Sequence, residues 1–431
     1  MGPDRRRERQ VDEVEARIAA AAAEALAAPK AAAEAAAGGW RRAGLAGAAI
    51  GVVAAGAAAG VAVERLTVGR GMRRRARLAL DASGPYGTLR GTPGTAIAED
   101  GTALHYEVDE PDAAPQAATA RRRRLFGRKA PVPATVVFSH GYCLTQDSWH
   151  FQRAALAGVV RTVHWDQRSH GRSGRGRAQA EGVPVTMEQL GRDLKAVIDA
   201  AAPEGPLVLA GHSMGGMTVM ALAEQFPELV RERVVGVALV GSSGGKLSEV
   251  DFGLPVVGVN AVRRVLPGVL KVLGSQVDLV ERGRRATADL FAGVVKRYSF
   301  GSRDVDPGVV RFAERLIEST PIDVVAEFYP AFTEHDKAEA LPLLAEVPVL
   351  VLAGDRDLIT PSAHSEVIAA ALPDAELVLV PDAGHLVMLE HPEAVTDRLA
   401  DLLVRAGAVP GATTVGGHGN TAHPDRPRER P

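Results

Sequence analysis

The chain has 431 residues, a length sufficient for one large catalytic domain and further segments. Of these residues 46% are hydrophobic and 24% are charged, and the net charge at pH 7 is −2. Residues 1–130 carry 21 Lys+Arg against 15 Asp+Glu, while the remainder carries 29 against 37, so the front is basic and the rest acidic. The basic part shows no basic face interleaved with aromatic residues, which argues against nucleic-acid binding and favours an anionic membrane surface. Cys143 is the single cysteine, which excludes an internal disulfide.

The front of the chain divides into three parts. Residues 1–43 are rich in Ala and Arg and include an expected helix at 11–39. Residues 44–63 contain no charged or strongly polar side chain, and as a helix they would span about 30 Å, the thickness of a bilayer core. This predicts a single-pass transmembrane helix, although a stretch so rich in Ala and Gly also fits a loose linker. Residues 64–90 form a basic linker, whose arginines favour a cytoplasmic catalytic domain.

An alternation of apolar strands and helical patterns occupies residues 91–405. It opens with strands 95–99 and 104–108, which the Asp100-Gly101 turn joins into a hairpin. Residues 111–131, with the run Arg121–Arg124, interrupt the domain as an exposed loop, a solvated basic insertion or, less favoured, a lipid-headgroup contact. The other expected strands are 134–139, 161–166, 206–210, 234–240, 347–353 and 376–380, and the expected helices are 187–201, 216–226, 362–371 and 392–406.

The sequence Gly211-His212-Ser213-Met214-Gly215 lies between an apolar strand and a helical pattern that ends at Pro227. A serine on a strained turn between strand and helix is typical of a nucleophile elbow. Side chains at positions 211 and 215 would collide with neighbouring backbone, which explains the two glycines. The helix that begins here directs free N–H groups toward the reacting atom.

Five motifs together resemble the α/β-hydrolase fold serine hydrolases, in particular the esterase and monoacylglycerol-lipase-like members. They are Gly211–Gly216, His140-Gly141-Tyr142, the loop from Asp166 to Ser173, and the pair Gly354–Pro361 with Pro381–His385. The resemblance covers roughly residues 91–405. It implies an α/β-hydrolase fold: a mostly parallel eight-stranded sheet flanked by helices, with a helical cap at about 242–335.

The resemblance also implies roles for the first half of the site. The backbone N–H groups of Tyr142 and Met214 would form the oxyanion hole, which stabilises the negative charge that acyl transfer places on the carbonyl oxygen. His140 is expected to be a structural hydrogen-bonding group. Asp166 and His170 belong to a scaffold loop, in which Ser169 replaces the glycine usual in the family.

The cap and the acid–base pair complete this interpretation. Apolar residues from Val256 to Leu273 either line an acyl pocket or hold the cap in place. Two acids, Asp355 and Asp357, follow the strand at 347–353, and the family spacing selects Asp357. His385, in the loop after the last strand, is expected to be the general base.

The order Ser213, Asp357, His385 predicts a serine hydrolase that cleaves carboxylic esters, possibly derived from lipids, through an acyl-enzyme. Other chemistry of the same triad stays open: hydrolysis of thioesters, amides or carbon–carbon bonds, and cofactor-free peroxidation. A non-catalytic, membrane-tethered binding module is the alternative of a different class. No metal or organic cofactor is implied, and residues 406–431 are expected to be a disordered tail.

Overall fold

The computed structural model describes residues 86–112, 132–250 and 288–409, all in the compact unit Arg70–Pro431. The predicted transmembrane helix at 44–63 and most of the basic linker therefore lie outside the described residues. The same holds for most of the loop at 111–131 and for the tail beyond 409. In the part that the structure describes, no helix is long and apolar enough to cross a membrane.

The domain is built on one sheet of eight strands in the order β1-β2-β4-β3-β5-β6-β7-β8. The antiparallel pairs are β1 with β2 and β2 with β4, and every other pair is parallel. This confirms the expected mostly parallel sheet and its opening hairpin. The strands are β1 Thr92–Ile97, β2 Ala103–Asp109, β3 Thr135–Ser139, β4 Arg161–Trp165, β5 Leu207–His212, β6 Val234–Val240, β7 Val349–Gly354 and β8 Glu376–Val380.

The four expected helices are present as α7 Met187–Ala201, α8 Met214–Gln225, α15 Ser362–Ala371 and α17 Pro392–Arg405. Further helical elements, which the sequence pattern did not predict, are η2 Gln146–Trp149, α5 His150–Leu156, α6 Arg177–Ala180, α9 Pro227–Arg233, η4 Ala338–Leu344 and α16 Val387–Glu390. Pro227 does not simply end a helix, since it is the first residue of α9. Proline suits this position because the first N–H of a helix has no partner within the helix.

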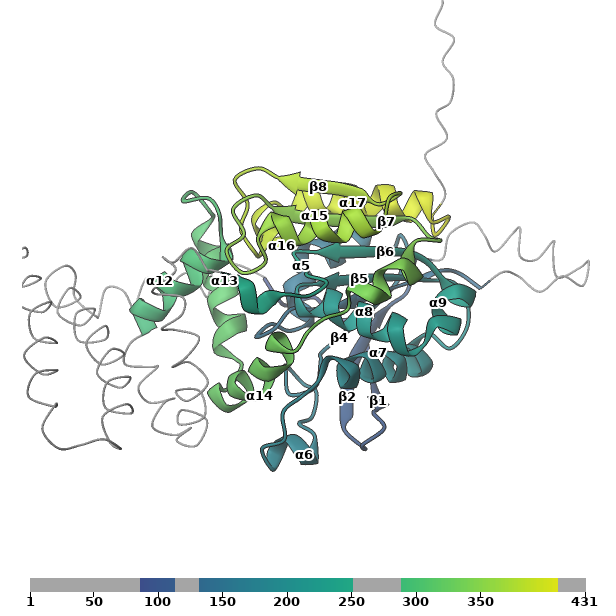
Figure 1. Cartoon of the computed structure of the whole chain (residues 1–431), viewed down its shortest axis with the longest axis horizontal. Coiled ribbons are helices and arrows are strands. Elements are labelled where there is room, and N and C mark those ends of the chain that lie inside the picture. Colours follow the sequence, from purple (N-terminus) through teal and green to yellow (C-terminus); the bar gives the residue numbers. More distant parts are fainter. Residues whose placement is uncertain (1–85, 113–131, 251–287, 410–431) are drawn as a thin grey trace, which may run out of the picture. The chain divides into compact units, whose positions relative to one another are not determined.

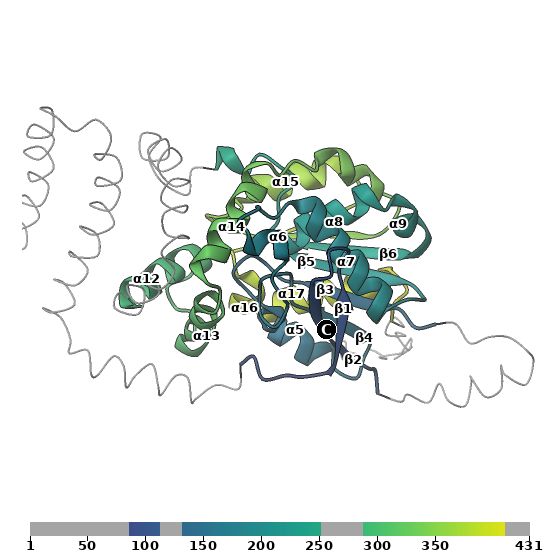
Figure 2. The same ribbon diagram turned by 90° about the horizontal axis from the view of Figure 1, so that it is seen from below.

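The alternation of side chains along each strand separates two cores. On β5, Leu207 and Leu209 face one cluster, whereas Val208 and Ala210 face the other. The first cluster is closed by α7, α8 and α15, and the second by α5, α16 and α17. Figures 1 and 2 show these helices covering the two faces of the sheet.

The expected helical insertion follows β6. Its described elements are η3 Leu247–Glu249, α12 Ala288–Ser299, α13 Pro307–Glu318 and α14 Ile322–Thr333, which we call the cap. A third core cluster joins Val324, Phe328 and Ala331 of α14 to Met214 and Met217 at the start of α8. The apolar residues from Val256 to Leu273, which were expected to line a pocket or hold the cap, lie outside the described residues.

Candidate active site

Ser213 occupies the turn between β5 and α8. Its backbone has φ +52° and ψ −117°, a conformation that a residue with a side chain rarely adopts and that costs about 1–3 kcal/mol. A Cβ at position 215 would lie 2.2 Å from the carbonyl oxygen of Ser139, and one at position 211 would lie 2.4 Å from the carbonyl carbon of Gly215. The predicted need for glycine at both positions is confirmed.

Backbone hydrogen bonds hold this turn in place. The N–H of Ser213 donates to the carbonyl oxygen of Val240 at 2.8 Å, and its own carbonyl oxygen accepts from the hydroxyl of Ser242 at 2.9 Å. The side chain is nearly buried, and among the described residues its hydroxyl forms no hydrogen bond. In unliganded enzymes, the hydrogen bonds between catalytic groups are often long or poorly aligned.

His385 and Asp357 form a buried pair. Nδ1 of His385 lies 2.7 Å from Oδ2 of Asp357, whose other oxygen accepts from the N–H groups of Ile359 at 2.8 Å and Thr360 at 2.9 Å. Burial alone would raise the pKa of Asp357, but His385 and the hydrogen bonds from His385 and Thr360 outweigh it and lower this pKa. Asp355, the competing acid, is exposed.

Thr360 is a member of the site that the sequence did not reveal. Its Oγ1 lies 2.8 Å from Oδ2 of Asp357, 2.8 Å from the carbonyl oxygen of Gly241 and 3.3 Å from Nδ1 of His385. A hydroxyl has one proton, so it can donate to only one acceptor at a time. Its spacing could have indicated this role, because Thr360 lies three residues after Asp357. The side chain of an aspartate often accepts hydrogen bonds from backbone N–H groups of the turn that follows it.

His212 connects the serine turn to the loop of the histidine. Its Nε2 lies 2.9 Å from the carbonyl oxygen of His385, and the two rings are 4.8 Å apart. Burial and the neighbouring His385 lower the pKa of His212 to about 3, so the ring is neutral at physiological pH. A neutral ring that donates from Nε2 joins the residue before Ser213 directly to His385. The structure therefore brings the segments of all three residues together.

The two backbone groups expected in the oxyanion hole are both available. Within the described residues, the N–H groups of Tyr142 and Met214 donate no hydrogen bond. The Tyr142 side chain points to the cap: its hydroxyl donates to the carbonyl oxygen of Val325 at 2.5 Å, and its ring lies 5.9 Å from that of Phe328 and 4.8 Å from that of Phe332. Tyr142 thus links the expected oxyanion hole to α14.

The loop from Asp166 to Ser173 supports the turn that carries Tyr142. Nε2 of His140 accepts from the N–H of Gln167 at 2.9 Å, and Nε2 of His170 accepts from the N–H of Cys143 at 3.2 Å. Burial lowers the pKa of His140 to about 4 and that of His170 to about 3, so both rings stay neutral and serve as acceptors. Oδ1 of Asp166 accepts from the N–H of Gln146 at 2.8 Å. These contacts agree with the structural roles that were expected.

Ser169 replaces a glycine in this loop and keeps the glycine-like backbone, with φ +63°. Its hydroxyl donates to Oε1 of Glu327 on α14 at 3.1 Å. Nε of Arg175 contacts the other oxygen of Glu327 at 2.8 Å, and Arg175 also pairs with Asp323 on the same helix. The substitution therefore adds a polar contact between the loop and the cap.

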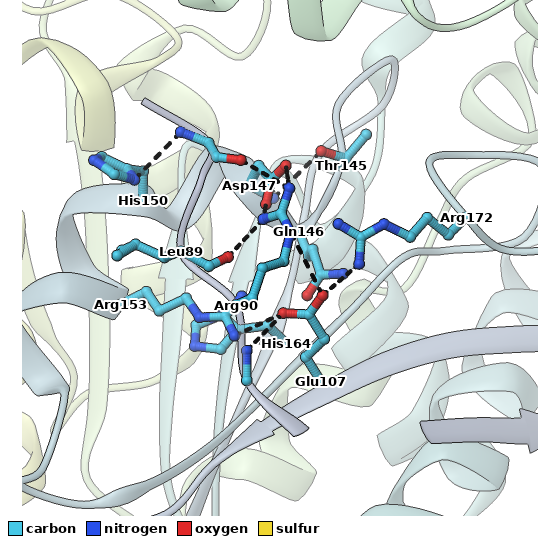
Figure 3. Close-up of polar contacts among 12 residues, drawn as sticks. Leu89, Arg90, Glu107, Thr145, Gln146, Asp147, His150, Arg153, His164 and Arg172 are labelled. Carbon is cyan, nitrogen blue, oxygen red and sulfur yellow. Dashed lines mark hydrogen bonds and ion pairs between the residues drawn. The ribbon is translucent and has the colours of Figure 1, made fainter. Parts of the chain in front are cut away.

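A buried polar cluster supports the same turn from the hairpin side (Figure 3). Glu107 of β2 accepts from the N–H of Gly91 at 2.9 Å and from Nη2 of Arg153 at 2.8 Å, and it also pairs with Arg172. Burial would raise the pKa of Glu107, but these three donors lower it to about 2. Arg90 contacts Asp147 beside the turn at 2.8 Å. No sequence motif indicated this cluster, since its members come from segments that are distant in the chain.

Across residues 86–112, 132–250 and 288–409, no group of three or more His, Cys, Asp or Glu side chains is arranged to hold a metal ion.

The family of the chain follows from its similarity to known proteins. The sequence model described as alpha/beta hydrolase fold matches residues 134–392, which is more than half of the chain. The chain belongs to the α/β hydrolase family. This hydrolase is 31% identical over 288 residues to the sn-1-specific diacylglycerol lipase ABHD11 of Mus musculus, a match that covers 65% of this chain and 83% of the relative.

Other relatives and solved structures agree with the family. A non-heme haloperoxidase of Rhodococcus erythropolis is 28% identical over 273 residues, 62% of this chain and 90% of that protein. The structure of the esterase RhEst1 from Rhodococcus sp. ECU1013 matches with a TM-score of 0.55 at 20% identity, covering 73% of this chain and all of that one. An enol-lactonase from Burkholderia xenovorans LB400 matches with a TM-score of 0.53 at 24% identity, covering 72% and 100%. These structures share the fold.

Proposed function

We propose that this hydrolase cleaves carboxylic esters with Ser213 as nucleophile, His385 as general base and Asp357 as the acid that orients the base. The observation that carries the proposal is the buried contact of 2.7 Å between His385 and Asp357, joined through His212 to the strained Ser213 turn. A serine, an imidazole and a carboxylate in this order form the relay that acyl transfer requires.

In the first half of the reaction, Oγ of Ser213 attacks the ester carbonyl carbon while Nε2 of His385 takes the hydroxyl proton. The carbonyl oxygen becomes negative and accepts from the N–H groups of Tyr142 and Met214, each worth about 3–4 kcal/mol in the transition state. His385 then protonates the departing alcohol, which leaves an acyl-enzyme. Asp357, with its lowered pKa, stays ionised and stabilises the imidazolium.

In the second half, water takes the place of the alcohol. His385 removes a proton from the water as it attacks the acyl carbon, and the same two N–H groups stabilise the second oxyanion. Collapse of this intermediate returns the proton to Ser213 and releases the carboxylic acid.

The substrate class that we propose is a small ester, including lipid-derived esters. The mouse relative is a diacylglycerol lipase, and solved structures of the same fold include esterases and an enol-lactonase. The apolar residues of α14 and the start of α8, which meet beside Ser213, support an apolar acyl group.

A series of p-nitrophenyl esters with acyl chains from two to sixteen carbons tests this proposal on the full chain. We expect hydrolysis that Ser213→Ala abolishes, with the highest kcat/KM for medium or long acyl groups. A preference for two-carbon acyl groups would remove the lipid part, and equal activity of wild type and Ser213→Ala would reject the nucleophile.

We also propose that residues 44–63 attach the enzyme to a membrane, with the catalytic domain on the cytoplasmic side. The support is the uncharged 20-residue sequence and the arginines that follow it. Alkaline carbonate extraction of the full chain should leave it in the membrane fraction, and release into the supernatant would contradict the anchor. Destruction of the catalytic domain by protease added to intact cells would contradict the orientation.

A further inference from the structure

The carboxylate of Glu390 in α16 accepts hydrogen bonds from the backbones of two segments that are distant in the chain. Its Oε2 accepts from the N–H of Gly384 at 2.7 Å, and its Oε1 accepts from the N–H of Ser302 at 2.7 Å. The N–H of Gly301 lies 3.1 Å from Oε1 and 3.0 Å from Oε2. Gly384 directly precedes His385, whereas Gly301 and Ser302 belong to the segment that leaves the cap helix α12.

The two backbones are in direct contact at this point. A Cβ at position 384 would lie 2.5 Å from the carbonyl carbon of Phe300, and a Cβ at position 301 would lie 2.5 Å from that of Ala383. Only glycine on both sides permits this approach. The N–H of Leu386 continues the contact, since it donates to the carbonyl oxygen of Ser299 at 2.8 Å.

The chemistry of the contact requires a carboxylate. Three backbone N–H groups need acceptors, and an ionised carboxylate offers about four lone-pair sites on two oxygens. Hydrogen bonds to a charged acceptor are also shorter and stronger than those to a neutral one. A glutamine amide offers one acceptor oxygen, and its NH₂ group would face donors.

We propose that Glu390 is a positioning residue, which holds the loop of His385 against the segment leaving the cap and so fixes the imidazole for proton transfer. This inference rests on the proposed role of His385 as general base. The residues before and after His385 are each tied to the cap side, Gly384 through Glu390 and Leu386 through Ser299. With Asp357 holding the ring, the cap and the base then keep one fixed geometry.

Glu390→Gln and Glu393→Gln on the full chain form the matched pair of variants for this proposal. Glu393 lies three residues further along, is exposed, and makes no hydrogen bond or ion pair among the described residues. With the p-nitrophenyl ester that wild type prefers, we expect Glu390→Gln to lower kcat by about ten- to a hundred-fold with KM within about two-fold, because a small displacement of a catalytic group has effects of this size. Glu393→Gln should match wild type. Glu390→Asp, which keeps the charge on a shorter side chain, should recover part of kcat.

Hydrogen exchange measured by mass spectrometry provides a readout independent of catalysis. In folded Glu390→Gln or Glu390→Asp, peptides that contain residues 300–303 and 383–386 should exchange faster together, while peptides of β5 and β7 stay at the wild-type rate. Equal kcat in Glu390→Gln and Glu393→Gln, or faster exchange in only one of the two segments, would overturn the proposal. If wild type hydrolyses no ester, the proposed function fails, and the exchange result still decides whether Glu390 joins the two segments.

Discussion

The two sides of the candidate site are held by different kinds of contact. On the base side, hydrogen bonds to buried polar groups fix His385: Asp357 holds the ring and His212 the carbonyl oxygen. On the oxyanion side, Tyr142 is held by the hydrogen bond from its hydroxyl to the carbonyl oxygen of Val325 and by aromatic packing against Phe328 and Phe332 of the cap. The base-side contacts are therefore directional hydrogen bonds, whereas the oxyanion side adds aromatic packing against α14 to its hydrogen bond.

This difference indicates how the cap acts on catalysis. Directional hydrogen bonds hold the His385 loop, and their partners are His212 at the end of β5, Asp357 after β7, Glu390 in α16 and Ser299 in α12. The packing of Tyr142 changes when α14 moves, so displacement of this cap helix acts directly on the expected oxyanion donors. Each prediction below concerns one side or compares both, in order of decreasing expected effect.

Asp357→Asn breaks the base side. The amide oxygen is expected to keep the bonds from the N–H groups of Ile359 and Thr360, so the NH₂ group faces Nδ1 of His385 and favours the wrong tautomer. We therefore expect kcat for ester hydrolysis to fall by about 10⁴-fold. The matched control is Asp355→Asn, whose exposed side chain should leave kcat within about two-fold. An equal loss in both variants would show that the acid has been assigned wrongly.

Phe328→Ala breaks the oxyanion side. The ring is fully buried between Tyr142 and His170, and its removal should lower the free energy of unfolding by about 3–5 kcal/mol. Urea unfolding measures this loss, and Val367→Ala, at a position that is 60% exposed, should stay within about 0.5 kcal/mol of wild type. Hydrogen exchange of the His385 loop should not change in Phe328→Ala; faster exchange there would mean that the two sides are not independent.

Acidification should weaken both sides, but the oxyanion side more. Burial lowers the pKa of His140 to about 4 and of His170 to about 3 on that side, and of His212 to about 3 on the base side. Because the unfolded chain binds these protons near pH 6.5, the stability from the neutral rings is present above pH 6.5 and is lost as the pH falls toward 3–4. Unfolding free energies at pH 7.5 and pH 5.5 should differ by about 1 kcal/mol per histidine. Equal or higher stability at pH 5.5 would contradict this account.

Glu327→Gln should have the smallest effect. It removes the charge that faces Ser169 and Arg175, but Arg175 is about one-third exposed and therefore screened by water. We expect a loss of about 1 kcal/mol in unfolding free energy and a decrease of a few-fold in kcat/KM. Glu376→Gln, which removes exposed pairs with Arg398 and Arg405, provides the baseline. A loss in Glu327→Gln no greater than this baseline would show that the polar contact does not hold the cap.

The sequence predicted the sheet well because its strands are apolar on both faces. In β5, β6 and β7 almost every residue is buried. These strands therefore appear in the sequence as nearly continuous apolar runs, as is typical of parallel strands buried on both faces. Helix α5 was missed because its buried residues include His150, Gln152 and Arg153, polar side chains that hide the periodicity. Their partners come from distant segments, which no local pattern reports.

The same distinction applies to the site. Ser213 and His385 were found because each lies in a short motif at the end of a strand. Thr360 lies within the Gly354–Pro361 motif but was not singled out, because its contacts with Gly241 and His385 join segments that are distant in the sequence. The polar cluster of Glu107 and Arg153 was missed because it exists only after β2 and α5 have packed together.

Labelling with a fluorophosphonate probe, followed by mass spectrometry of the labelled peptide, tests the central claim most directly. The account predicts one modified residue, Ser213, in the wild-type full chain, and no labelling of Ser213→Ala. Labelling of wild type at another residue, or equal labelling of Ser213→Ala, would contradict it.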